Sequence, residues 1–132
     1  MLRTSAIAFA VLFAAVVAVG YWPPFITPIN AEERMLFDLF AISLLDDITH
    51  SVTAVAALAA ALLSHRTTRL FFIAFGSYYA LDAVFYLTYG LFNDLTWLQD
   101  VLLNLPHVLI AAAMLGLVWG ERRGAARPAA PA

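Results

Sequence analysis

The stretch SLLDDITH at Ser43–His50, continued by an apolar run to Ser64, decides how this chain can fold. From Ser51 onward the run is almost entirely Ala, Val and Leu, and one helix of this length crosses a bilayer. Its first two turns nevertheless carry two carboxylates and an imidazole, which are costly in a membrane unless partners or water lie close by. The central question is therefore what Asp46, Asp47 and His50 face.

The composition is that of an integral membrane protein. Of the 132 residues, 64% are hydrophobic and 12% are charged, with a mean hydropathy of +0.87. A soluble domain is about half apolar, and this chain has too little polar surface to cover a water-soluble core. The net charge of −2 and the lack of Lys argue against a nucleic-acid partner. The lack of Cys excludes disulfides, thiolate metal sites and iron–sulfur clusters.

Four apolar stretches predict an all-α fold, an antiparallel up-down four-helix transmembrane bundle in contact with the lipid bilayer. We expect a single domain over residues 1–120, followed by a basic, disordered cytoplasmic tail at 121–132. Ahead of the second span, Asn30 is expected to cap a helix that starts at 31–34 and continues through 35–42. The expected spans are residues 2–22, 41–64, 70–91 and 98–119.

The N-terminal apolar stretch allows two interpretations. Arg3, an apolar core and the small residues at 18–20 are also typical of a secretory signal that is cleaved before Tyr21. The length of the run and the distribution of arginines favour an uncleaved span. If there are four spans, the seven arginines divide six to one between the two sides, with only Arg34 apart. The positive-inside rule then places both termini in the cytoplasm of a bacterial inner membrane.

Three of the expected spans carry polar side chains at a similar depth. At about 1.5 Å per residue, the inner members of this set lie about 9–14 Å below the outer membrane boundary. Helical spacing places the polar residues of each span on one face, which suits the interior of a bundle. We call this set the Asp/His layer. It comprises Asp46, Asp47, His50, Asp82, Asn104 and His107.

The Asp/His layer fits several functions, and the leading one is not enzymatic. Its mixed nitrogen and oxygen groups suit a divalent metal ion such as zinc, iron or manganese. Intramembrane acids also mark proton sites. His50 and His107 lie at equal depth on separate spans, so they could ligate haem b in a haem- or quinone-associated redox subunit. Alternatively, the layer is only a polar staple in a structural accessory subunit of a membrane complex. The leading hypothesis is a small binding or accessory membrane protein that holds a metal ion or proton, and homo-oligomerisation fits its small apolar bundle.

Three motifs resemble a bacterial four-helix membrane family catalogued as a domain of unknown function. The first joins LFDLF at 36–40 with LDDITH at 45–50, the second is GSYYAL at 76–81, and the third is NLPH at 104–107. The resemblance implies the four-span fold and the polar layer, and it implies no reaction. Family members commonly have His where this chain has Asp46. If the family binds a metal, this difference keeps a possible ligand but changes its charge. A likeness to the four-span DoxX-type membrane proteins is more distant.

Overall fold

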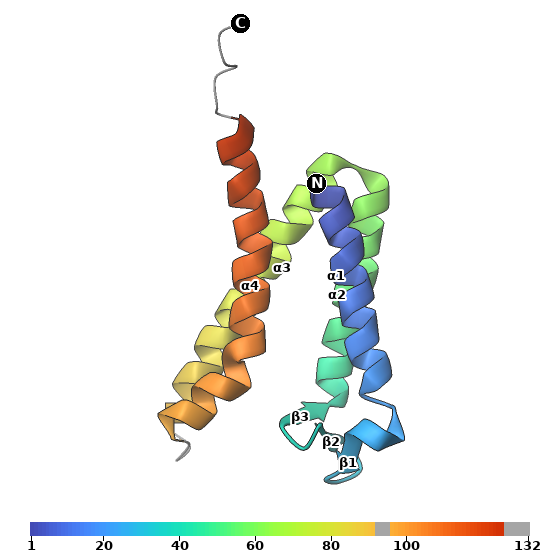
Figure 1. The fold of residues 1–132 in the computed structure, drawn as a ribbon, viewed down its shortest axis with the longest axis vertical. Helices are drawn as coiled ribbons and strands as arrows, with labels where there is room; N and C mark the ends of the chain where they lie inside the picture. Colours follow the sequence, from blue (N-terminus) through green and yellow to red (C-terminus); the bar gives the residue numbers. More distant parts are fainter. Residues whose placement is uncertain (92–95, 126–132) are drawn as a thin grey trace, which may run out of the picture. The chain divides into compact units, whose positions relative to one another are not determined.

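A computed structural model describes residues 1–91 and 96–125, and most of them are helical. Each of the four long helices includes a segment that is long and apolar enough to cross a membrane. The chain divides into two compact units, one holding Arg3–Thr68 and the other the residues from Arg69 onward. Figure 1 labels the helices α1 (Leu2–Val19), α2 (Leu44–Leu63), α3 (His65–Leu91) and α4 (Trp97–Ala125).

The four expected spans are confirmed as helices, with two differences at their ends. Only Ser64 separates α2 from α3. Its hydroxyl caps the start of α3 by accepting a hydrogen bond from the backbone N–H of Thr67 at 3.1 Å. The basic stretch at 65–69, which lies between two expected spans, therefore begins α3. Helix α4 continues through Ala125, so the start of the expected tail is helical, and residues 126–132 lie outside the described chain. The single up-down bundle and single domain stay predictions.

The prediction of a helix over residues 31–42 is wrong, because this segment contributes two strands. The Asn30 carboxamide oxygen accepts hydrogen bonds from the backbone N–H groups of Glu32 and Glu33, at 2.8 and 2.9 Å, as a helix cap would. The same local bonds also build turns, so the cap signal did not distinguish the two outcomes. After the 3₁₀ turn η1 (Pro23–Phe25), an antiparallel sheet has the order β1 (Ile26–Pro28), β2 (Glu33–Leu36), β3 (Phe40–Ser43).

In the first unit, α1 and α2 run antiparallel and the sheet packs against their ends. Arg3 near the start of α1 donates from Nε to the carbonyl of Ala61 near the end of α2, at 2.6 Å. At the other end, a Cβ on Gly20 would lie only 3.1 Å from the Ile42 side chain, so glycine permits the close approach of β3. Leu36 and Ile42 are the buried residues of the sheet.

In the second unit, α3 and α4 also run antiparallel and approach each other closely at glycines. A Cβ on Gly76 would lie 3.0 Å from atoms of Met114 and Leu115. Towards the other end of α3, a Cβ on Gly90 would overlap the carboxylate of Asp100. The four long apolar helices thus pack in pairs, and each pair brings its own polar residues together.

Candidate functional site

Asp46 completes the N-terminal cap of α2. Its carboxylate accepts hydrogen bonds from the backbone N–H and the hydroxyl of Ser43, at 2.8 and 2.7 Å. In return, the Ser43 hydroxyl accepts from the backbone N–H of Asp46 at 3.3 Å. This reciprocal capping box satisfies helix N–H groups that have no intrahelical partner. The arrangement assigns Asp46 to holding the start of the helix.

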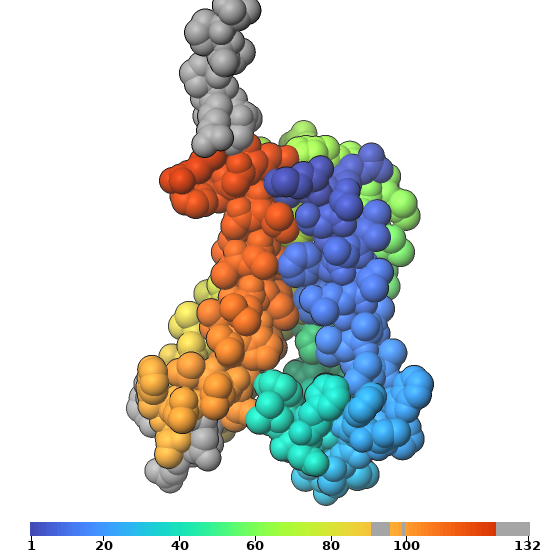
Figure 2. Space-filling model, in the orientation of Figure 1, coloured from blue at the N-terminus to red at the C-terminus, as the bar shows by residue number. Residues whose placement is uncertain are grey.

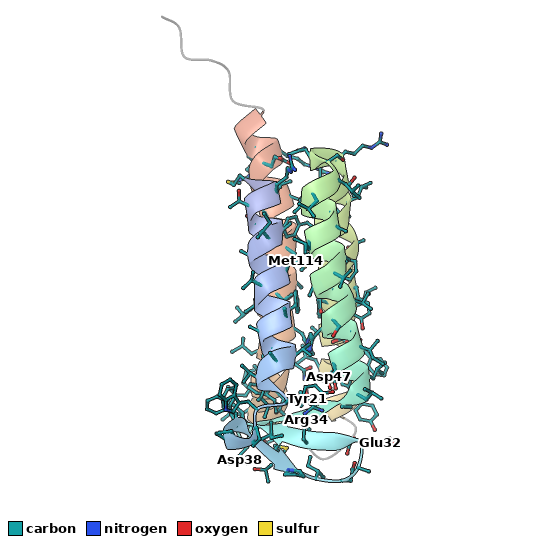
Figure 3. The ribbon with its side chains drawn as sticks, turned by 90° about the vertical axis from the view of Figure 1, so that its right-hand side faces the viewer. Tyr21, Glu32, Arg34, Asp38, Asp47 and Met114 are labelled. Carbon is teal, nitrogen blue, oxygen red and sulfur yellow. The ribbon has the colours of Figure 1, made fainter. Side chains whose placement is uncertain are left out.

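Asp47 is buried and is bound by two residues that lie far from it in the sequence. Arg34 of β2 donates from Nη2 to both carboxylate oxygens, at 2.8 and 2.7 Å, and the Tyr21 hydroxyl donates to Oδ2 at 2.7 Å. Figure 3 shows these side chains meeting where the sheet joins the helices. We call Tyr21, Arg34 and Asp47 the Asp47 cluster. It places a permanent cation beside the buried acid, which offsets the cost of removing the carboxylate from water.

The rest of the Arg34 side chain fixes the end of α1. Its Nε donates to the Gly20 carbonyl, and its guanidinium lies 4.3 Å from the centroid of the Tyr21 ring. The hydrogen bond to Asp47 is the main cause that raises the pKa of Tyr21 above its ordinary value of 10.0, and the nearby Arg34 opposes this rise. One arginine of β2 thereby connects α1, the sheet and α2.

His50 lies one turn further along α2 and contacts α1. Its imidazole stacks on Phe13, with ring centroids 5.6 Å apart and planes inclined by 26°. Phe13 is almost completely buried, whereas His50 is half-buried. The histidine therefore belongs to the contact between the first two helices.

In the second unit, Asp82 of α3 is paired with His107 of α4. Oδ2 of Asp82 and Nδ1 of His107 are 3.0 Å apart, and the two side chains retain 20% and 26% of their exposure. Nδ1 is itself buried and has no well-directed hydrogen bond to a described residue. The contact therefore depends on proximity and charge, and it is an ion pair only when the imidazole carries a second proton. Buried Tyr79 packs beside His107, with ring centroids 5.8 Å apart.

Asn104 supports a different acid, Asp100, one turn before it in α4. Its Nδ2 donates to both the backbone carbonyl and Oδ1 of Asp100, each at 2.9 Å. Both side chains are buried. Asn104 thus satisfies the carboxylate that lies against Gly90.

The residues of the Asp/His layer are therefore found in two groups, each within one unit. Asp46, Asp47 and His50 lie along the start of α2, and Asp82 contacts His107. Over residues 1–91 and 96–125, no three His, Asp or Glu side chains form a group that could hold a metal ion. The metal and haem hypotheses combine residues of both units and stay predictions.

The sequence reading missed the partners of Asp47. In the sequence, Arg34 stands out only as the single arginine on the side opposite the other six, and Tyr21 only as the residue after the possible cleavage site. The separation of Arg34 from the other arginines was a signal for its role, since an arginine near an acid-bearing span is a candidate counter-ion. The sequence does not show which nearby acid pairs with Arg34, because the pairing with Asp47 depends on the turn that brings Arg34 back to α2.

The fold and these polar contacts define a multi-pass membrane protein built from pairs of apolar helices. A family model described as Domain of unknown function (DUF4383) matches residues 3–120. This match covers most of the chain, so the protein belongs to that family. No curated protein and no solved structure matches it.

Proposed function

We propose that this protein binds and releases a proton inside the membrane at the Asp82–His107 pair. The observation that carries the proposal is the 3.0 Å approach of Nδ1 of His107 to Oδ2 of Asp82, between two helices that are each apolar enough to span a bilayer. Histidine changes charge near physiological pH, and ionisable residues inside membranes are usually functional. Both side chains retain part of their exposure, so neither is sealed within the helix pair.

The surroundings of the pair support proton binding over a fixed ion pair. Other polar or titratable groups on these two helices include Tyr79, against the imidazole, Tyr86, one turn after Asp82, and Asp100 with its partner Asn104. Asp100 is almost fully buried and contacts Asn104, so Asp82 is the better placed acid to exchange a proton with His107. Asp46 and Asp47 contribute to a cap and an arginine pair instead.

Nitrogen NMR of the histidines in lipid nanodiscs tests this proposal. The three imidazoles are assigned with His→Gln variants, and exposed His65 serves as the solvent-accessible control. We expect the His107 resonances to change with pH, and to change differently in Asp82→Asn. His107 resonances that do not change with pH, or that are the same in Asp82→Asn, would refute proton exchange at the pair.

The proposal also includes an orientation in the bacterial inner membrane. Six of the seven arginines lie on one side of a four-span topology, which supports cytoplasmic termini. A reporter protein that works only in the cytoplasm should therefore be active when it is fused after Ala132. Activity of a periplasm-dependent reporter at the same position would reverse the orientation. The pair is then reached from the periplasmic half of the bilayer, since the outer ends of α3 and α4 are nearer to it.

A further inference from the structure

The connector between α1 and α2 displays large apolar side chains at one end of its sheet. Phe25, Phe37 and Leu39 are 43%, 56% and 52% exposed, and we call them the aromatic end. Phe25 and Phe37 are in contact, with ring centroids 5.2 Å apart, and the backbone N–H of Phe37 donates to the Phe25 carbonyl at 2.8 Å. Figure 2 shows the connector, light blue to cyan, on the surface of the first unit.

The opposite end of the same sheet carries most of its polar side chains, next to exposed Ile29. Asn30, Glu32 and Glu33 form the turn between β1 and β2 and are exposed, and we call them the acidic end. Figure 3 shows Glu32 and Asp38 at opposite ends of the sheet, across the ends of α1 and α2. The connector is therefore amphipathic along its strands.

The backbone at the aromatic end holds a bulky residue in an unfavourable conformation. Phe37 and Asp38 have φ values of 55° and 54°, a region that favours Gly and Asn. Such a conformation is strained for a residue with a bulky side chain and is a reason to look for a function at the site. The Asp38 carboxylate is hydrogen-bonded, since the Thr27 hydroxyl donates to it at 2.6 Å. The turn thus projects an exposed aromatic ring and keeps its acid hydrogen-bonded.

We propose that the aromatic end inserts into the lipid interface of the membrane while the acidic end stays in water. The covalent connections support this placement, because the sheet lies between the end of one candidate span at Val19 and the start of the next at Leu44. Aromatic side chains with polar neighbours are enriched at the headgroup level. The outer strands have unpaired backbone groups, which restricts the sheet to a depth that water still reaches.

Single-cysteine labelling tests the insertion, and the cysteine-free chain provides a clean background. Phe37→Cys and Leu39→Cys report on the aromatic end, and Glu32→Cys is the matched control at the other turn of the sheet. Each variant is spin-labelled in liposomes, and its collisions with oxygen and with a water-soluble nickel chelate are measured by EPR. Circular dichroism and unfolding midpoints check that each variant folds.

We expect nickel accessibility at Phe37 and Leu39 to be several-fold lower than at Glu32, with oxygen accessibility higher. Nickel accessibility equal to that at Glu32 would place the aromatic end in water and refute the proposal. Shielding from both reagents would indicate a protein contact, such as a second copy of the chain, and would refute it equally. If Phe37→Cys fails to fold because of its turn, Leu39→Cys alone gives the same discrimination.

Discussion

The two helix pairs of this protein handle a membrane acid in different ways. In the first unit, Asp47 is buried against Arg34, a cation that keeps its charge at any physiological pH, and also accepts from Tyr21. In the second unit, Asp82 contacts His107, whose charge depends on protonation. An acid in an apolar helix thus meets a permanent cation in one unit and, in the other, an imidazole whose charge depends on its proton.

The largest expected effect is that of removing the cation from the Asp47 cluster. Arg34→Met leaves the Asp47 carboxylate buried without its counter-ion, and such a loss costs about 3–5 kcal/mol of unfolding free energy. Denaturation in mixed micelles, followed by circular dichroism, measures the change. Arg66→Met, at an exposed arginine, is the control and should have little effect. If the two variants are equally stable, the Arg34–Asp47 pair does not stabilise the first unit.

A smaller effect should come from the close helix approach of the second unit. Gly90→Ala forces a methyl group into the Asp100 carboxylate and should cost about 2 kcal/mol through overpacking. Gly116→Ala is the matched control, because a Cβ there meets nothing within 4 Å. The control should be neutral or slightly stabilising, since alanine favours helix. Equal unfolding midpoints for the two variants would contradict the close contact between α3 and α4.

Truncation of the Asp82–His107 pair should cost less unfolding free energy than truncation of the Arg34–Asp47 pair. Asp82→Ala removes the partner of His107, but both side chains are partly exposed, so the expected loss is about 1 kcal/mol. The same denaturation assay compares it directly with Arg34→Met. A loss as large as that of Arg34→Met would show that the Asp82–His107 pair is a fixed structural contact, and the contrast between the units would disappear.

The smallest effect concerns the phenol of the Asp47 cluster. The pKa of Tyr21 is raised above 10.0 mainly by its hydrogen bond to Asp47, so the folded state holds this proton more tightly than the unfolded state. Its contribution to stability is complete below pH 10 and is lost as pH rises through the higher folded-state value. Tyrosinate absorbance in a pH titration should lose a component that titrates above pH 10 in Tyr21→Phe. An unchanged titration curve would contradict the hydrogen bond.

Sequence reasoning reached the helices and several of the polar residues but not their partners. Hydropathy over about 20 residues identifies a span without reference to the rest of the chain, so all four helices were predictable. Asp82 and His107 were both selected because acids and imidazoles are rare in apolar helices. The sheet was missed because Asn30 makes the same bonds at a turn as at a helix cap. Its strands depend on contacts such as Gly20 with Ile42, which no local pattern encodes.

The sequence by itself determined the class of protein, the number of apolar helices and the set of polar residues they carry. These properties follow from the composition and from the spacing of apolar and polar residues, which can be read from short stretches of the chain. Only the tertiary structure decided that Arg34 neutralises Asp47 and that Asp82 contacts His107. The physical reason is that a charge pair depends on a few ångströms between atoms that are distant in the chain, and chain reversal sets that distance.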